Sequence, residues 1–284
     1  MAAVKSAAQW KDFYAREREA LGDVGLAERL DGAPEVELRR GEALVFPHTR
    51  MAVTGHLTAA VARAVVRSGA DEVLALGVLH GGREQDAKRV KRARGGDPIA
   101  RGALRRVHAR EDAVCAEEFS LDNFEALLAV ASAREGKKPP RVVARYPFLV
   151  GDDLARLPGL DDVMRLAERM PVVATTDPLH HGAGYGTPEH GRRGEHEEAT
   201  VVFARFSIQK QLELLLGAKW AAFQQLADLV RSDFRDTGPV LAHALGPGTE
   251  RRGEILELHL VDYSDVLQAE PPTWVAGPLM RITA

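Results

Sequence analysis

The sequence contains almost no cysteine: Cys115 is the only one in 284 residues. A single cysteine excludes an internal disulfide and any structural zinc or iron-sulfur site built from several thiolates. A metal ion bound by this chain would therefore need histidine and carboxylate ligands. The sequence supplies ten histidines.

Long apolar runs are also absent. No stretch approaches the roughly 20 consecutive apolar residues that a bilayer-spanning helix needs, and residues 1–20 lack the apolar core of a signal peptide. We therefore expect no membrane partner and a cytoplasmic location. The sequence leaves the oligomeric state open, a homo-oligomer included.

Acidic and basic residues nearly balance over the whole chain, so the formal net charge is only -3. The exception is the segment 83–110, in which ten lysines and arginines face three acidic residues. It lacks the interleaved aromatic side chains on which bases stack, so we do not expect nucleic-acid binding. We interpret 83–110 as a basic insertion loop, either merely solvated or acting as a lid that attracts an anionic substrate or an acidic partner surface.

Several catalytic motifs are missing. The glycine-rich loop Gly182–Gly186 does not have the spacing of the dinucleotide fingerprint, and the chain contains neither a Walker sequence nor a GxSxG elbow. Nucleotide-dependent and serine-hydrolase functions are therefore poor explanations of this sequence.

What the chain does have is alternation of apolar β-type segments with helical ones. Strands are predicted at 35–40, 43–46, 72–79, 141–150, 171–176, 254–263 and 273–282; helices are predicted at 56–68, 117–133, 152–170, 195–216, 218–234 and 237–245. A further helical segment occupies residues 1–35. With no repeat or low-complexity linker, we expect residues 1–284 to form a single α/β domain with a mostly parallel central sheet flanked by helices.

Three of the predicted strands run into a histidine. Ala43–Phe46 leads to His48, residues 72–79 lead to His80, and the strand that begins PVVATTDP leads to His180 and His181. Open α/β sheets bind their ligands at the carboxyl ends of parallel strands, and neutral imidazole suits zinc, copper, iron or nickel. We hypothesise that His48, His80 and His180 bind one metal ion.

Four segments also resemble the Memo-like protein family, in the expected order over about residues 40 to 190. FPHTRMAVTGHLTAA resembles the PHAGY-x-YSG-x-x-AA segment of those proteins, LALGVLHGG their LLGPSH, EEFSLDNF their EHSLE, and TTDPLHHG their SSD-x-x-H-x-G. The family histidine of EHSLE is replaced by Phe119, which implies a more apolar pocket.

The resemblance implies the α/β fold that Memo-like proteins share with class III extradiol dioxygenases, which use one non-haem iron(II) ion. It implies metal-site roles for His48, His80 and His180, and carries the motif aspartate onto Asp177. A further metal-site residue would fall near 233–239, where the chain has Asp233, Arg235 and Asp236 but no cysteine.

Two arrangements of the site remain open. In one, His48 and His80 with Asp236 hold the metal, and His180 or His181 is the base that removes a proton from the substrate. In the other, which we favour because D-x-x-H-x-G is intact, His180 is the third ligand, and Asp177 orients a histidine without touching the metal.

The function expected from this site is that of an iron(II)-dependent oxygenase or oxidoreductase acting with O2 on a small organic substrate, aromatic compounds included. Iron(II) is the expected metal, with copper and zinc as the other metals compatible with these ligands. The alternative is a metal-binding scaffold protein that retains the pocket without catalysis.

Overall fold

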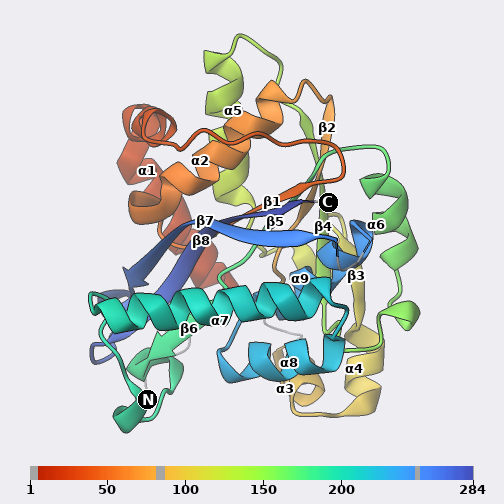
Figure 1. The fold of residues 1–284 in the computed structure, drawn as a ribbon, viewed down its shortest axis with the longest axis vertical. Helices are drawn as coiled ribbons and strands as arrows, with labels where there is room; N and C mark the ends of the chain where they lie inside the picture. Colours follow the sequence, from red (N-terminus) through yellow and green to blue (C-terminus); the bar gives the residue numbers. More distant parts are fainter. Residues whose placement is uncertain (1–5, 81–86, 247–249, 284) are drawn as a thin grey trace.

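Eight strands form one mixed sheet in the computed structural model, which describes residues 6–80, 87–246 and 250–283 (Figure 1). The order is β3-β4-β2-β5-β1-β8-β6, and β7 pairs with β8 beside this path. The strands are β1 (Ala43–Phe46), β2 (Glu72–Leu76), β3 (Arg106–Ala109), β4 (Arg141–Phe148), β5 (Val172–Thr175), β6 (Leu179–Gly182), β7 (Arg252–Asp262) and β8 (Thr273–Thr283).

Parallel pairing is confined to the four central strands β4, β2, β5 and β1. Strands β1 and β5 are buried throughout, as expected for short apolar strands that are covered on both faces. Successive residues of β1 alternate between two cores: Leu44 and Phe46 belong to one cluster, Ala43 and Val45 to the other. The outer strands β3, β6, β7 and β8 pair antiparallel.

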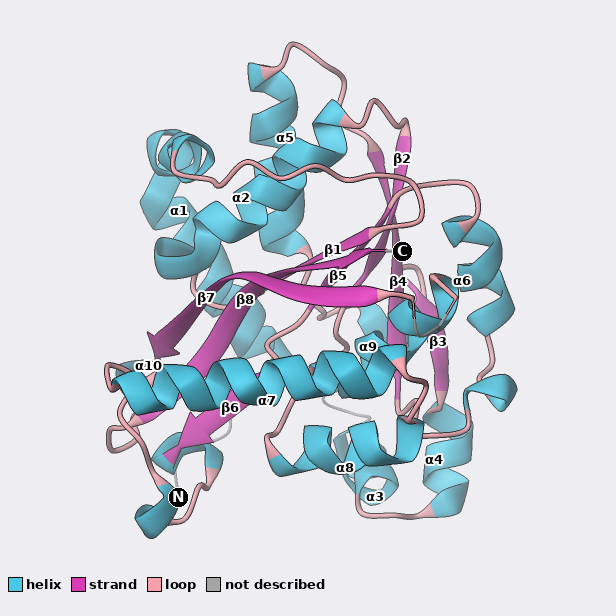
Figure 2. Ribbon diagram, in the orientation of Figure 1, coloured by secondary structure: helices cyan, strands magenta, loops and turns pink. Residues whose placement is uncertain are grey.

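Helices cover both faces of the sheet (Figure 2). The kinked helix α1 (Ala7–Asp31), α2 (Met51–Arg67) and α5 (Asp122–Arg134) pack against one another on one face. On the other face lie α6 (Leu160–Ala167), α7 (Glu198–Leu216), α8 (Trp220–Leu229) and α9 (Phe234–Ala244), and a short α10 (Ser264–Leu267) precedes β8. The expected single α/β domain with a helix-flanked sheet is confirmed at this level.

The basic segment 83–110 is not a loop, contrary to our prediction. Within its described part it forms α3 (Ala87–Arg94), α4 (Pro98–Leu104) and β3, and residues 83–86 lie outside the described residues. Asp97 accepts hydrogen bonds from the backbone N–H groups of Ile99 and Ala100, which caps the start of α4. Lysines and arginines are good helix formers, so this basic segment forms two short helices without a clear apolar period, although each contributes buried residues such as Val90 and Leu104 to the core.

Other element boundaries differ from those predicted. Residues 35–40 are extended but pair with no described strand, and the helix predicted from 117 begins only at Asp122. The predicted strand 171–176 is followed by a separate strand, β6, formed by LHHG. No helix among the described residues is long and apolar enough to cross a membrane.

Candidate metal centre

The three predicted histidines converge on one carboxylate. His48 follows β1, His80 follows β2, and His180 lies in β6. The Oδ2 atom of Asp233, at the N-terminus of α9, lies 3.5 Å from Nε2 of His48, 3.8 Å from Nε2 of His80 and 3.6 Å from Nε2 of His180. The carboxyl ends of two parallel strands, an antiparallel strand and a helix N-terminus thus meet at one point.

The Nδ1 atom of each imidazole forms a hydrogen bond that fixes the ring. His48 Nδ1 lies 3.2 Å from the hydroxyl of Thr175, whose own proton goes to the carbonyl of Phe46. His80 Nδ1 bonds Glu118 Oε1 at 3.0 Å, and His180 Nδ1 bonds the carbonyl oxygen of Arg231 at 2.6 Å. All three partners accept a hydrogen bond from Nδ1, so Nδ1 carries the proton. The neutral ring then keeps its Nε2 lone pair for a metal ion at the centre of the site.

The spacing of the donor atoms fits a metal ion. Nε2 of His48 and Nε2 of His80 are 3.2 Å apart. Ligands bound at about 2.1 Å to one ion are separated by about 3.0 Å in octahedral and about 3.4 Å in tetrahedral geometry. One ligand atom each from His48, His80 and Asp233 lies within 4.8 Å of the others, and the same holds for Asp177, His180 and Asp233.

The charged groups in this centre favour the binding of a cation. Burial disfavours the imidazolium of His48, but Asp177 and Asp233 outweigh this and raise its pKa to about 9. Burial likewise opposes ionisation of Asp233, yet the three histidines hold the pKa of its carboxyl well below the usual range. Without a metal, a proton on His48 supplies part of the positive charge that the two carboxylates require.

Glu118 is the main contributor that sequence reasoning missed. Its carboxylate is buried and accepts hydrogen bonds from the backbone and the Nδ1 atom of His80, and from the backbone N–H groups of Phe119 and Ser120. Burial raises the pKa of Glu118, but His80 and these donors more than compensate and lower it. The sequence pattern predicts a helix for the EEFS segment, whereas the structure has a turn there that fixes His80.

Aromatic side chains form much of the surrounding pocket, a cavity of 340 Å³. Phe119 stacks on His80 with ring centroids 4.4 Å apart, so this wall of the pocket is apolar. Tyr185, from the glycine-rich loop, meets His180 edge to face at 4.8 Å. Gly182 makes this loop geometry accessible: its φ is +101°, and a Cβ there would lie 1.9 Å from the carbonyl oxygen of Pro272.

Two of the predicted catalytic residues lie elsewhere. His181 stacks on Trp274, and its Nε2 accepts the backbone N–H of Arg193; strand alternation puts it on the opposite face from His180. Burial and nearby arginines lower the pKa of His181. It is a structural histidine on the sheet face covered by α7, outside the pocket.

Asp236 is the second correction. Its Oδ1 accepts the backbone N–H of Val150, which ties α9 to the end of β4. Asp233, one helical turn earlier, is the carboxylate that faces the histidines. Asp177 is near the centre, as expected: its Oδ1 accepts the backbone N–H of His48 at 3.2 Å, and its Oδ2 lies 3.6 Å from His48 Nε2.

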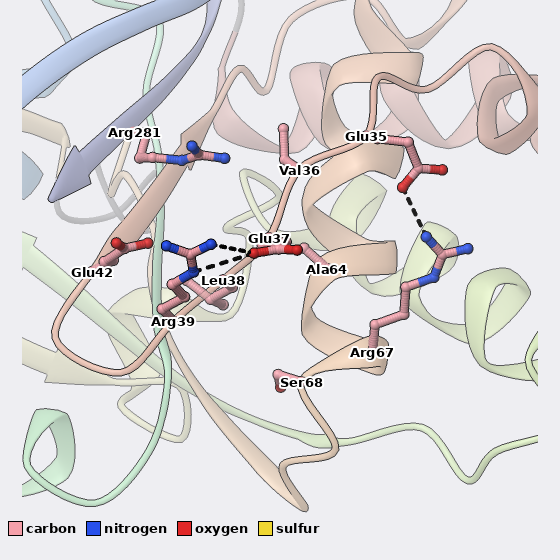
Figure 3. Close-up of a pocket in the computed structure, with 10 residues that line it drawn as sticks. All are labelled: Glu35, Val36, Glu37, Leu38, Arg39, Glu42, Ala64, Arg67, Ser68 and Arg281. Atoms are coloured by element: carbon pink, nitrogen blue, oxygen red, sulfur yellow. Dashed lines mark hydrogen bonds and ion pairs between the residues drawn. The ribbon is translucent and has the colours of Figure 1, made fainter.

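A larger cavity of 660 Å³ lies at the opposite end of β1, beside residues 35–42 and the last turn of α2 (Figure 3). Four of its six charged side chains already pair with one another, Glu37 with Arg39 and Glu35 with Arg67. Converging imidazoles are found in the smaller pocket, which is therefore the candidate functional site.

A comparison with models of known protein families matches none of them, and no curated protein is significantly similar to the chain. Function must consequently be inferred from the geometry of the site itself.

Proposed function

We propose that this protein is a mononuclear non-haem iron(II)-dependent oxidoreductase that acts on a small organic substrate with O2. The observation that carries the proposal is the set of His48 Nε2, His80 Nε2 and Asp233 Oδ2, three donor atoms within 4.8 Å of one another in a pocket. Two histidines and one carboxylate are the ligand set typical of such oxygenases. The resemblance of the histidine segments to Memo-like proteins and class III extradiol dioxygenases supports the same assignment.

When bound, iron(II) would supply open coordination positions for O2 and for a substrate oxygen. The residues around it have supporting tasks. Thr175 and Glu118 fix the rings of His48 and His80 with Nε2 facing inward, and Asp177 holds the backbone of His48. Such partners preserve both the position and the basicity of a metal ligand.

His180 is suited to move a proton. Its Nδ1 proton is committed to the carbonyl of Arg231, so Nε2 is free to accept a proton from a substrate hydroxyl placed in the pocket. Asp233 Oδ2, 3.6 Å from this nitrogen, would stabilise the imidazolium that results. In this arrangement His180 is the base beside the ligands His48, His80 and Asp233, the first of the two arrangements considered above with Asp233 in place of Asp236.

The pocket favours a flat substrate with a negative charge. Trp10, Tyr14, Phe119, Tyr185 and Tyr263 provide aromatic lining. Arg94, from the basic segment, also lines the pocket, and its guanidinium lies 5.8 Å from the centroid of the Phe148 ring. No carboxylate among the described residues is within ion-pair distance of Arg94, so it can pair with an anionic group of the substrate.

One observation favours the second candidate, a non-catalytic metal-binding scaffold. Asp233 Oδ2 lies within 4 Å of Nε2 of all three histidines, and these donors would saturate a tetrahedral zinc ion that drew His180 into the set of His48, His80 and Asp233. A metal held in this way would have no open position. Replacing His180 separates the two functions, because a base can be lost without losing the metal.

The deciding experiment combines metal analysis with O2 uptake. Protein purified without oxygen should contain one equivalent of iron, and His180→Ala should retain that iron while losing O2 uptake that depends on an added aromatic carboxylate. Stoichiometric zinc or copper with no O2 uptake for any aromatic compound tested would instead support the scaffold function. Loss of the metal in His180→Ala would make His180 a ligand.

A further inference from the structure

A second group of metal-type side chains lies on the edge strand β7, away from the pocket. Residues two apart on a strand share a face, and Glu257 and His259 both face α2, where His56 lies. Oε1 of Glu257 is 2.9 Å from Nε2 of His56 and 2.8 Å from Nε2 of His259. The two imidazoles meet edge to face, with ring centroids 5.1 Å apart.

A bulge in β7 makes this group possible. The register of β7 against β8 shifts between Ile255 and Glu257, which changes the face on which the following residues lie. His259 then pairs with Gly277 of β8, and the space above Gly277 is taken by Pro47, Thr49 and Thr54 at the start of α2. Strand β7 and helix α2 are thus held together so that His56 and His259 both contact the carboxylate of Glu257.

We propose that His56, Glu257 and His259 form a second metal site that binds Zn²⁺. The three donor atoms lie within 4.8 Å of one another. Two imidazole nitrogens and one carboxylate oxygen are a donor set found around zinc, with water in the fourth position. The site is open enough for that water, because Glu257 and His259 each expose more than a third of their side chains.

The chemistry of this group differs from that of the pocket. Within the described residues, Nδ1 of His56 and Nδ1 of His259 have no hydrogen-bond partner, so Glu257 supplies the only hydrogen bond to each ring. Burial opposes ionisation of Glu257, but hydrogen bonds from His259 and His56 lower its pKa, so the carboxylate is charged and ready to bind a cation. The second site should therefore exchange its metal more readily than the pocket.

The same three side chains also serve a purely structural purpose without a metal. Among the described strands β7 pairs only with β8, and a bulge with inward-facing charges is a common protection of an exposed edge. Two hydrogen bonds to Glu257 would be sufficient for that. The test must therefore detect bound metal and not stability alone.

The experiment is a titration of the full-length, metal-stripped protein with Zn²⁺, followed by calorimetry and by metal analysis after gel filtration. The wild type should bind two equivalents, His259→Ala one, His48→Ala one, and the double variant none. His196→Ala is the matched control: this histidine also lies beside a glutamate, 3.5 Å from Glu195, but it is almost fully exposed and belongs to neither site. It should bind two equivalents.

Zinc binding that is the same in the wild type, His56→Ala and His259→Ala would overturn the proposal, whatever the number of equivalents bound by the pocket. Far-UV circular dichroism checks that each variant is folded, and His259→Gln, which keeps a hydrogen bond to Glu257 but is a poor zinc ligand, replaces any variant that is not. Because the readout is zinc stoichiometry, the result does not depend on whether the pocket catalyses a reaction.

Discussion

The Nε2 atoms of His48 and His80 lie 3.2 Å apart, although the Nδ1 atom of each ring is already bonded, to Thr175 and to Glu118. Two lone pairs that face each other at this distance repel unless a proton or a metal ion lies between them. The fold therefore holds the residues that follow β1 and β2 in an arrangement that favours a bound cation.

Replacing either histidine should remove the metal from the pocket. We expect His48→Ala and His80→Ala each to lose one equivalent of bound iron(II), because removal of one nitrogen leaves an incomplete ligand set. The matched control is His181→Gln, next to a site residue in sequence but stacked on Trp274 outside the pocket. Metal analysis after anaerobic gel filtration measures the effect; an unchanged iron content in His48→Ala would contradict the assignment.

Asp233 and Asp236 should behave differently although they are three residues apart. Asp233→Asn removes the charged oxygen that faces the three imidazoles, so metal binding should fall while the fold remains. Asp236→Ala should keep the metal and lower the free energy of unfolding by about 1–3 kcal/mol, because the buried N–H of Val150 is left without its acceptor. Urea unfolding and metal titration on both variants separate the two roles, and equal metal loss in both would refute them.

Glu118→Gln tests the residue that orients His80. A glutamine keeps the size of the side chain but loses the charge that favours the Nδ1 proton, so we expect metal affinity to fall about 10–100-fold. The protein should still bind one equivalent at high metal concentration. A competition assay with a chromogenic chelator measures the change, and wild-type affinity in this variant would show that Glu118 serves only the turn.

The sequence predicted the centre of the sheet and the three histidines because both depend on local patterns. Buried parallel strands consist of short apolar runs, and the residues that follow them lie at one sheet edge by geometry alone. His48 and His80 are in this category. His180 lies at the same site for a different reason, because it belongs to the antiparallel strand β6.

The carboxylates could not be chosen in the same way. Asp233 and Asp236 both lie at the start of α9, and only the direction of that helix decides which one faces the pocket. Glu118 depends on a turn whose backbone N–H groups converge on its side chain. The direction of α9 and the turn at Glu118 both depend on tertiary contacts, which produce no periodic pattern in the sequence.

Metal affinity should rise with pH. The pKa of His48 in the metal-free fold is about 9, above its ordinary value of 6.5, so its proton stabilises the folded state below about pH 6.5, and this stabilisation disappears as the pH rises through 9. A metal must displace this proton. Affinity should therefore increase up to about tenfold per pH unit between pH 6.5 and 9 and then level off.

The matched variant for this pH dependence is Asp177→Asn. It keeps an oxygen for the backbone N–H of His48 but removes one of the charges that raise the pKa of that histidine. The pH at which affinity levels off should move down in this variant. Isothermal titration at several pH values measures it, and an affinity that is flat from pH 6.5 to 9 in the wild type would contradict a proton on His48.

Arg94 should select for a negatively charged substrate. Its guanidinium lines the pocket, and no described carboxylate forms an ion pair with it, so Arg94→Gln should weaken benzoate binding to the metal-loaded protein. A hydrogen bond to a charged group contributes about 1.5–3 kcal/mol, which corresponds to a loss of about tenfold or more. Arg89→Gln removes the same charge from the same helix α3 but from a side chain that does not line the pocket. Benzoate affinity should be unchanged in Arg89→Gln, and neutral benzamide should bind both variants alike. If both variants lose benzoate affinity equally, the effect is a general field of the basic segment, and Arg94 has no specific part in substrate recognition.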